Sequence, residues 1–146
     1  LLYFDKATIS NEKIREFVDL VKATTDGGVL TFAQVESRPF MKFWQNFIIC
    51  RYVEEKDDFR VIFFGTDLER HFGRDSTGKF ISERKFDQSG RSLRDVHMDA
   101  MKSSELSYGA GDLKEESRDF KIWHQVKMAL KRGDVINETL SFIVFD

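Results

Sequence analysis

The sequence predicts a single α+β domain, in which the strands form one antiparallel sheet and short helices cover one of its faces. Three observations lead to this prediction. The run 59–64 is rich in aromatic and β-branched residues, and a short helix and a glycine-containing loop follow it. Apolar and polar residues alternate over 120–130 and again over 136–144, which is the period of a strand. A helical apolar pattern over 11–25 precedes both.

Length and composition restrict the function classes. A chain of 146 residues is long enough for one domain with one core, and 41% hydrophobic with 33% charged residues is an ordinary balance for a soluble domain. The net charge of −2 gives no basic field for nucleic acid, and no apolar run approaches the roughly 20 residues of a membrane span. Cys50 is the only cysteine, which excludes an internal disulfide and a cysteine-rich zinc site. We expect a cytoplasmic location.

Residues 1–28 are predicted to form an N-terminal flanking helix. Ser10 can cap a helix that runs from about Asn11 to Thr25, and two glycines end it. The apolar stripe of this helix comprises Ile14, Phe17, Val18 and Val21. The stripe either covers the sheet of its own domain or forms a dimer interface.

Residues 29–146 form the predicted core, which begins with a hairpin. Residues 29–35 fit more than one kind of element, and the aromatic residues after Pro39 are predicted to plug the core as a helical or looped lead-in. The strands Phe47 to Val53 and Phe59 to Phe64 then pair through a polar turn. We expect Phe59, Val61 and Phe63 on one face, and Ile62 and Phe64 on the other. Because both faces are apolar, the N-terminal helix or a second subunit must cover the second face.

A phosphate-loop pattern follows this hairpin but lacks the required context. Thr66 and Glu69 have the spacing of a capping box, so we expect them to begin a short helix that Gly73 ends. Residues 73–79 then match G-x-x-x-x-G-K. Phe80 stands where a hydroxyl should reach Mg²⁺, and a helix precedes the loop where a strand is required. We therefore do not expect nucleotide hydrolysis.

A longer helix and three strands complete the predicted core. The helix runs from about Ser92 to Ser103, with His97 on its inner arc. Residues 108–115 contain two glycines and form a poor or bulged strand. The last two strands turn their even-numbered residues to the core, so an odd number of residues must connect them. We expect a three-residue loop at 132–134.

The segment 58–80 also carries a resemblance to a known family. Its residues read Asp58-Phe59-Arg60, then Gly65-Thr66, then Phe72-Gly73-Arg74-Asp75-Ser76-Thr77-Gly78-Lys79. This run resembles the core of PAS sensory domains, and specifically a bacterial subgroup with the pattern F-G-R-D-x-T-G-[RK]. The resemblance implies a first hairpin, short helices and three further strands in a five-stranded antiparallel sheet. It also implies a sensory or regulatory role in signal transduction.

The resemblance and the 15 phenylalanines together suggest a ligand-binding function. Our hypothesis is that a small apolar or aromatic ligand enters between the sheet and the helices at 66–72 and 92–103. Binding would signal by altered packing or dimer geometry. The expected lining residues are Phe63, Phe72, His97, Met101, His124 and Phe142. The expected partners are a second copy of the chain in a homodimer and an output domain or partner protein, without nucleic acid and without a membrane span.

No cofactor, metal or catalytic residue is expected. In some PAS domains a histidine on the corresponding helix ligates haem iron, and His97 is the residue that would do so here. The alternative is that His97 is a hydrogen-bonded histidine near the core, with a structural role only. The cysteine motif of flavin-binding PAS domains is absent.

Two alternatives to ligand sensing remain open. One is a dimerisation or protein-interaction module with a filled core. The other is a small enzyme on a cone-shaped α+β fold, with His124 and Glu138 as its acid–base pair.

Overall fold

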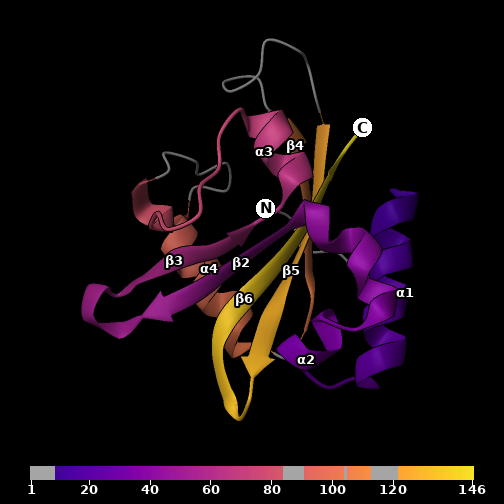
Figure 1. Ribbon diagram of the computed structural model, residues 1–146, viewed down its shortest axis with the longest axis horizontal. Coiled ribbons are helices and arrows are strands. Elements are labelled where there is room, and N and C mark those ends of the chain that lie inside the picture. The colour runs from indigo at the N-terminus through magenta and orange to yellow at the C-terminus, as the bar shows by residue number, and fades with distance from the viewer. Residues whose placement is uncertain (1–8, 84–90, 104, 113–121) are drawn as a thin grey trace.

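The computed structural model describes residues 9–83, 91–103, 105–112 and 122–146. Over these ranges the chain is α+β, with six strands in one mixed sheet (Figure 1). The strands are β1 (Leu30–Thr31), β2 (Phe47–Val53), β3 (Asp58–Phe64), β4 (Ser107–Asp112), β5 (Ile122–Arg132) and β6 (Val135–Phe145). Their order is β1-β5-β6-β2-β3, and β4 also pairs with β5.

The sequence led us to expect a purely antiparallel sheet, but the sheet in the structure is mixed. The two-residue strand β1 pairs with β5 in parallel, while the other strand pairings are antiparallel. The cause is local. Leu30 is buried opposite Leu130, and the chain turns at once into a helix through a capping box formed by Thr31 and Gln34. The ambiguous run 29–35 therefore supplies both a short strand and a helical turn.

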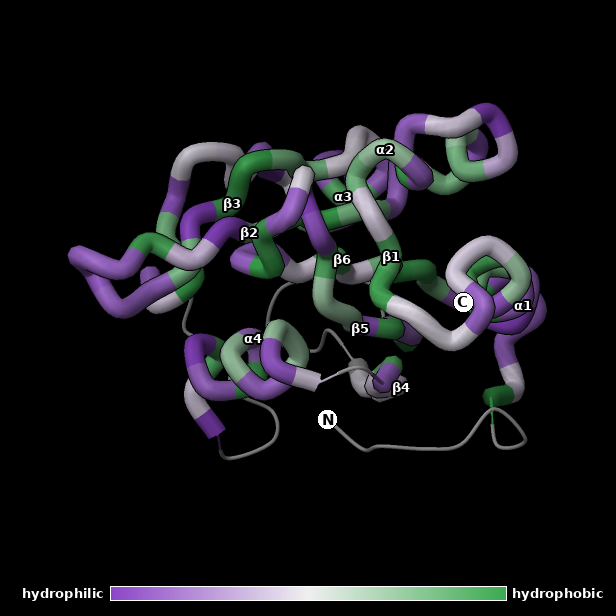
Figure 2. The backbone as a smooth tube through the Cα atoms, turned by 90° about the horizontal axis from the view of Figure 1, so that it is seen from below, coloured by the Kyte–Doolittle hydropathy of each residue, from purple (hydrophilic) through white to green (hydrophobic). Residues whose placement is uncertain are grey.

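Helices lie on both faces of the sheet. They are α1 (Glu12–Thr25), α2 (Phe32–Val35), η2 (Arg38–Asn46), η3 (Glu54–Lys56), α3 (Thr66–Phe72), η4 (Ile81–Glu83) and α4 (Leu93–Lys102). One apolar core joins α1, α2 and η2 to the sheet, and a second core joins α3, η4 and α4 to it. Figure 2 shows α1 and α4 on opposite sides of the strands. The four residues of the predicted α1 stripe are buried in the first core, so this helix covers its own sheet.

Most helix ends follow the predicted capping chemistry, with two corrections. Ser92 caps α4 as predicted, and its side chain accepts a hydrogen bond from Asp95 N. At α1 the cap is Asn11 rather than Ser10. At α3 the capping box of Thr66 with Glu69 is wrong, because Gly65 is the N-cap and makes no side-chain bond. The helix therefore begins at Thr66 itself.

A bulge between β2 and β3 changes which residues of β3 share a face. The register of β2 and β3 shifts between Ile49 and Cys50, so Phe64 joins Phe59 and Val61 in the α4-side core, whereas Phe63 lies opposite Ile49. The predicted alternation was wrong at this point.

A similar shift corrects the last hairpin. The turn between β5 and β6 holds two residues, Gly133 and Asp134, and not three. The register shift between Leu130 and Lys131 leaves Asn137 as an extra residue in β6. The prediction of an odd number of loop residues was therefore wrong, and the bulge in β6 is what keeps the even-numbered residues of both strands on one face.

The loop at residues 73–79 is held against β3. Asp75 accepts hydrogen bonds from the backbone N and the hydroxyl of Thr77, at 2.9 and 2.6 Å. Gly78 adopts a left-handed φ of 88°, and its N–H donates to Val61 O at 2.7 Å. These hydrogen bonds therefore fix the path of the chain. The helix α3 precedes this loop and the three-residue η4 follows it, which is not the context of a phosphate loop.

Substitution of Gly65 tests the close approach between α3 and η2. A Cβ at position 65 would lie 2.2 Å from Gln45 O, a backbone atom that cannot rotate away. We expect Gly65→Ala to lower the free energy of unfolding by about 3 kcal/mol or more. Gly73→Ala, at the other end of α3, meets nothing within 4 Å but has φ 74°, so it should cost only about 1–2 kcal/mol. Chemical denaturation of both variants measures the difference, and equal losses would contradict the crowding argument.

Candidate functional site

A cluster of buried polar side chains lies between α4 and the middle of the sheet. Its members are Lys127 on β5, Thr139 and Ser141 on β6, and His97 on α4, and each is at most 5% exposed. Lys127 Nζ donates to Ser141 Oγ at 2.7 Å and lies 3.2 Å from His97 Nε2. His97 Nδ1 lies 2.8 Å from Thr139 Oγ1. Buried polar groups are retained only when they are well bonded, so this cluster is the leading candidate for a functional site.

The register of the sheet brings these residues together. Lys127 lies directly opposite Ser141 across β5 and β6, and Thr139 lies opposite Ala129 two pairs further along. Side chains at alternate positions share a face, so all three strand residues point to the α4 side. His97 completes the cluster because it lies on the buried side of α4. The apolar surroundings include Phe59, whose ring centroid is 5.4 Å from that of His97.

Sequence reasoning found one of these four residues. His97 was identified from its position on the inner arc of the helix. Lys127, Thr139 and Ser141 were missed because they stand at the odd-numbered positions, which were assigned to the polar face of the last two strands. A usable signal existed: a lysine faces a serine in the middle of two long strands whose other face is apolar. Only the paired register makes that signal visible.

The predicted lining residues are divided by the sheet. Phe72, His97 and Met101 pack with the α4-side core. Phe142 is buried in the α1-side core, where its ring lies 4.5 Å from that of Phe17. Phe63 is 39% exposed on the outer strand β3. The sheet therefore separates the predicted lining residues, and the structure does not bring all of them together at one place. The three residues on the α4 side remain a prediction.

His124 belongs to a different network, at one end of the sheet. Its Nδ1 lies 2.6 Å from Tyr108 Oη, and its Nε2 lies 2.8 Å from Asp146 Oδ2. Asn11 Nδ2 also donates to Asp146, at 3.2 Å, and so ties the start of α1 to the end of β6. The hydrogen bond from His124 holds the pKa of Asp146 below its ordinary value. Burial raises the pKa of the Tyr108 hydroxyl.

Glu138 does not pair with His124, and the predicted acid–base pair is wrong. His124 lies opposite Val144, six residues along β6 from Glu138, which corresponds to roughly 20 Å in a strand. Glu138 is fully buried and accepts from Arg51 Nη2 at 3.0 Å and Arg132 Nε at 2.8 Å. The Arg132 guanidinium also lies 3.6 Å from the centre of the Phe32 ring. Glu138 therefore closes the end of the α1-side core.

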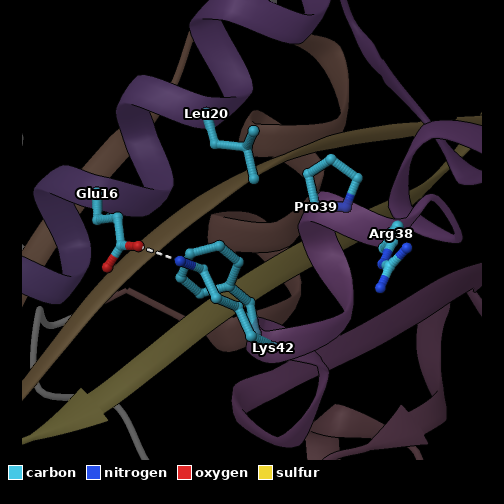
Figure 3. A pocket seen from close by; sticks show the side chains of 6 residues that line it. Glu16, Leu20, Arg38, Pro39 and Lys42 are labelled. Atoms are coloured by element: carbon cyan, nitrogen blue, oxygen red, sulfur yellow. Dashed lines mark hydrogen bonds and ion pairs between the residues drawn. The ribbon is translucent and has the colours of Figure 1, made fainter.

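A shallow groove of about 400 Å³ runs between α1 and η2 (Figure 3). Leu20, Pro39 and Phe43 contribute apolar surface to it, and Glu16 forms an ion pair with Lys42 across it. More than half of each charged side chain is exposed, so this pair contributes little stability.

Two observations bear on the metal and haem alternatives. The described residues contain no group of three or more His, Cys, Asp or Glu side chains that could hold a metal ion. Both ring nitrogens of His97 are engaged, so haem ligation would first have to break one of these contacts.

Within the described ranges, no helix has the length and apolar character needed to cross a membrane. Comparisons with protein-family models, curated proteins and solved structures found no match.

The contact between His124 and Asp146 predicts a loss of stability at acid pH. The pKa of Asp146 is lowered from 3.8, so the folded state binds this proton less readily than the unfolded chain. The stabilisation is therefore present above about pH 4 and is lost as the pH falls through the folded pKa. We expect Asp146→Asn to flatten the pH dependence of the unfolding free energy below about pH 4.

Denaturant titrations of the wild type and Asp146→Asn across this pH range make the measurement. Asp134→Asn is the matched control, because it removes an exposed carboxylate in the β5–β6 turn. Coincident pH profiles for the wild type and Asp146→Asn would show that the contact with His124 does not stabilise the fold.

Proposed function

We propose that this chain is a PAS-like sensory or regulatory domain that receives a small ligand between α4 and the sheet. The observation that carries the proposal is the buried cluster of Lys127, His97, Thr139 and Ser141 at this interface. Burying polar groups in an otherwise apolar layer costs free energy, which their hydrogen bonds offset, and apolar side chains could fill the same space without that cost, so a role beyond packing accounts for the cluster. Binding a ligand that carries a polar group is such a role.

The order of the elements supports the PAS-like part of the proposal. The five longer strands follow the order β4-β5-β6-β2-β3, and each pairs antiparallel with its neighbour. The helices α3, η4 and α4 lie between the first hairpin and the last three strands along the chain. The resemblance of residues 58–80 implies this same succession along the chain: a hairpin, then short helices, then three further strands. The short strand β1 is an addition at the β5 edge.

The chemistry of the interface suggests what kind of ligand it accepts. The polar atoms of the cluster converge on one place, and the surrounding side chains are apolar, including Phe59, Cys50 and Met98. A small molecule with an apolar body and one polar group fits this pattern. Contact with Lys127 or His97 would compete with the bond between them, and α4 carries His97. Ligand binding would therefore shift the packing of α4 on the sheet, which is a way to signal.

A ligand screen by thermal denaturation tests the proposal. Small aromatic alcohols, amides, acids and aldehydes are added to the wild type, and a true ligand at a hundred times its dissociation constant should stabilise it by about 2.7 kcal/mol. Ser141→Ala and Lys127→Met should reduce this effect. Lys131→Met, on the same strand but partly exposed, should retain it.

Native mass spectrometry of the protein purified from cells provides an independent measurement, because a retained ligand adds mass. If no compound stabilises the wild type more than Lys127→Met, and no retained mass is found, the ligand-binding proposal fails. The dimerisation or protein-interaction module with a filled core is then the better description.

A further inference from the structure

We infer that Lys127 is an amine that captures aldehydes or ketones as a reversible imine, with His97 as the base for this step. The inference rests on the proposed function, because it assigns a ligand class to the same interface. It concerns a covalent step, however, so it can fail while the proposal of a binding site stands.

The three side chains have the geometry of an activated nucleophile. Such sites place a nucleophile within hydrogen-bond reach of a base, and a third group orients that base. Here Lys127 Nζ lies 3.2 Å from His97 Nε2, and His97 Nδ1 lies 2.8 Å from Thr139 Oγ1. In the tautomer with the proton on Nδ1, the imidazole donates to Thr139 and presents the Nε2 lone pair to the amine.

Burial shields the amine and any carbonyl compound that it captures. Lys127 is 4% exposed, so an imine formed there would be kept from bulk water. The neutral amine carries the lone pair that attacks a carbonyl carbon, which is why lysines in apolar sites form imines. Ser141 Oγ lies 2.7 Å from Nζ on strand β6, where its hydroxyl could donate to the oxygen of the reacting carbonyl.

The proposed step balances without any further reactant. The Nζ lone pair attacks the carbonyl carbon, a C–N bond forms, and the carbonyl π electrons move to oxygen. The nitrogen then loses a proton to His97 Nε2, which passes it to the oxygen to give a neutral carbinolamine. His97 next relays the remaining nitrogen proton to the hydroxyl, which leaves as water as the C=N bond forms. An amine and a carbonyl compound thus give an imine and water, and hydrolysis reverses the step.

Reductive trapping with benzaldehyde and sodium cyanoborohydride at neutral pH tests this inference. Cyanoborohydride reduces an imine to a stable secondary amine, which peptide mapping locates. Benzaldehyde matches the aromatic surroundings provided by Phe59. Cys50 lies opposite Thr139 across β2 and β6, and its thiol can also add to an aldehyde. Cyanoborohydride does not convert that thiol adduct into an amine, so it does not confuse the measurement. We expect modification at Lys127 to be faster than at Lys42, although Lys42 has a 62% exposed side chain.

Three variants separate the chemistry from the fold. Lys127→Arg keeps a cationic side chain but cannot form the imine, so trapping at this position should vanish. His97→Gln should slow trapping at Lys127 by about 10²-fold, the contribution of a positioned base. Thr139→Val should change the pH profile of the trapping rate, because Thr139 positions His97, and Thr139→Ser should restore it. Circular dichroism and thermal denaturation confirm that each variant is folded.

The wild-type peptide map decides the matter even if a variant does not fold. Modification of Lys42 with Lys127 untouched would overturn the inference, as would an unchanged trapping rate in folded His97→Gln. A saturable thermal stabilisation by benzaldehyde without trapping would leave the binding site in place and remove the imine. Trapping that is equally fast in urea-unfolded protein would show that the fold does not activate the amine.

Discussion

The burial of the sheet on both faces is the constraint on which the rest of this structure depends. With α1, α2 and η2 on one face and α3, η4 and α4 on the other, the middle strands have no face toward water. Every polar side chain there must therefore find a partner within the protein. Lys127, Thr139 and Ser141 occupy such positions, and His97 reaches them from α4. The cluster thus forms because both faces of the sheet are buried and because three polar residues of β5 and β6 lie near one another on the same face.

The polar groups on the two faces of the sheet differ in position. On the α1 side, Glu138 with its two arginines closes one end of the core, and His124 with Tyr108 closes the other. These groups lie where the core meets solvent, which is the ordinary place for paired charges. Lys127 instead lies at the middle of β5. Lys127, on which the proposed site is built, therefore differs from these groups because it lies away from both ends of the sheet.

The sequence predicted the elements where a periodic pattern was long, and failed where a single residue shifted the register. The α1 stripe and the Ser92 cap were correct because each depends on local spacing. The bulges were missed because one extra residue leaves no trace in composition. Phe142 was grouped with His97 because alternation identifies residues that share a face, but not the helix that covers it. Lys127 was assigned to a wet face, since lysines are mostly exposed.

The proposed site is connected to the molecular surface through α4. This helix contributes His97 to the cluster, and near its start Arg94 donates to Asp57 Oδ1 at 2.6 Å, at the tip of the β2–β3 hairpin. Tyr52 Oη donates to the same carboxylate atom, also at 2.6 Å. The Asp57 side chain is 64% exposed, and exposed ion pairs contribute little stability, so this contact holds α4 only weakly. In the proposed site, a ligand that displaces His97 from Lys127 would shift the helix that also makes this exposed contact with the hairpin tip. The proposed chemistry in the buried layer would thereby be joined to an exposed contact through a single helix.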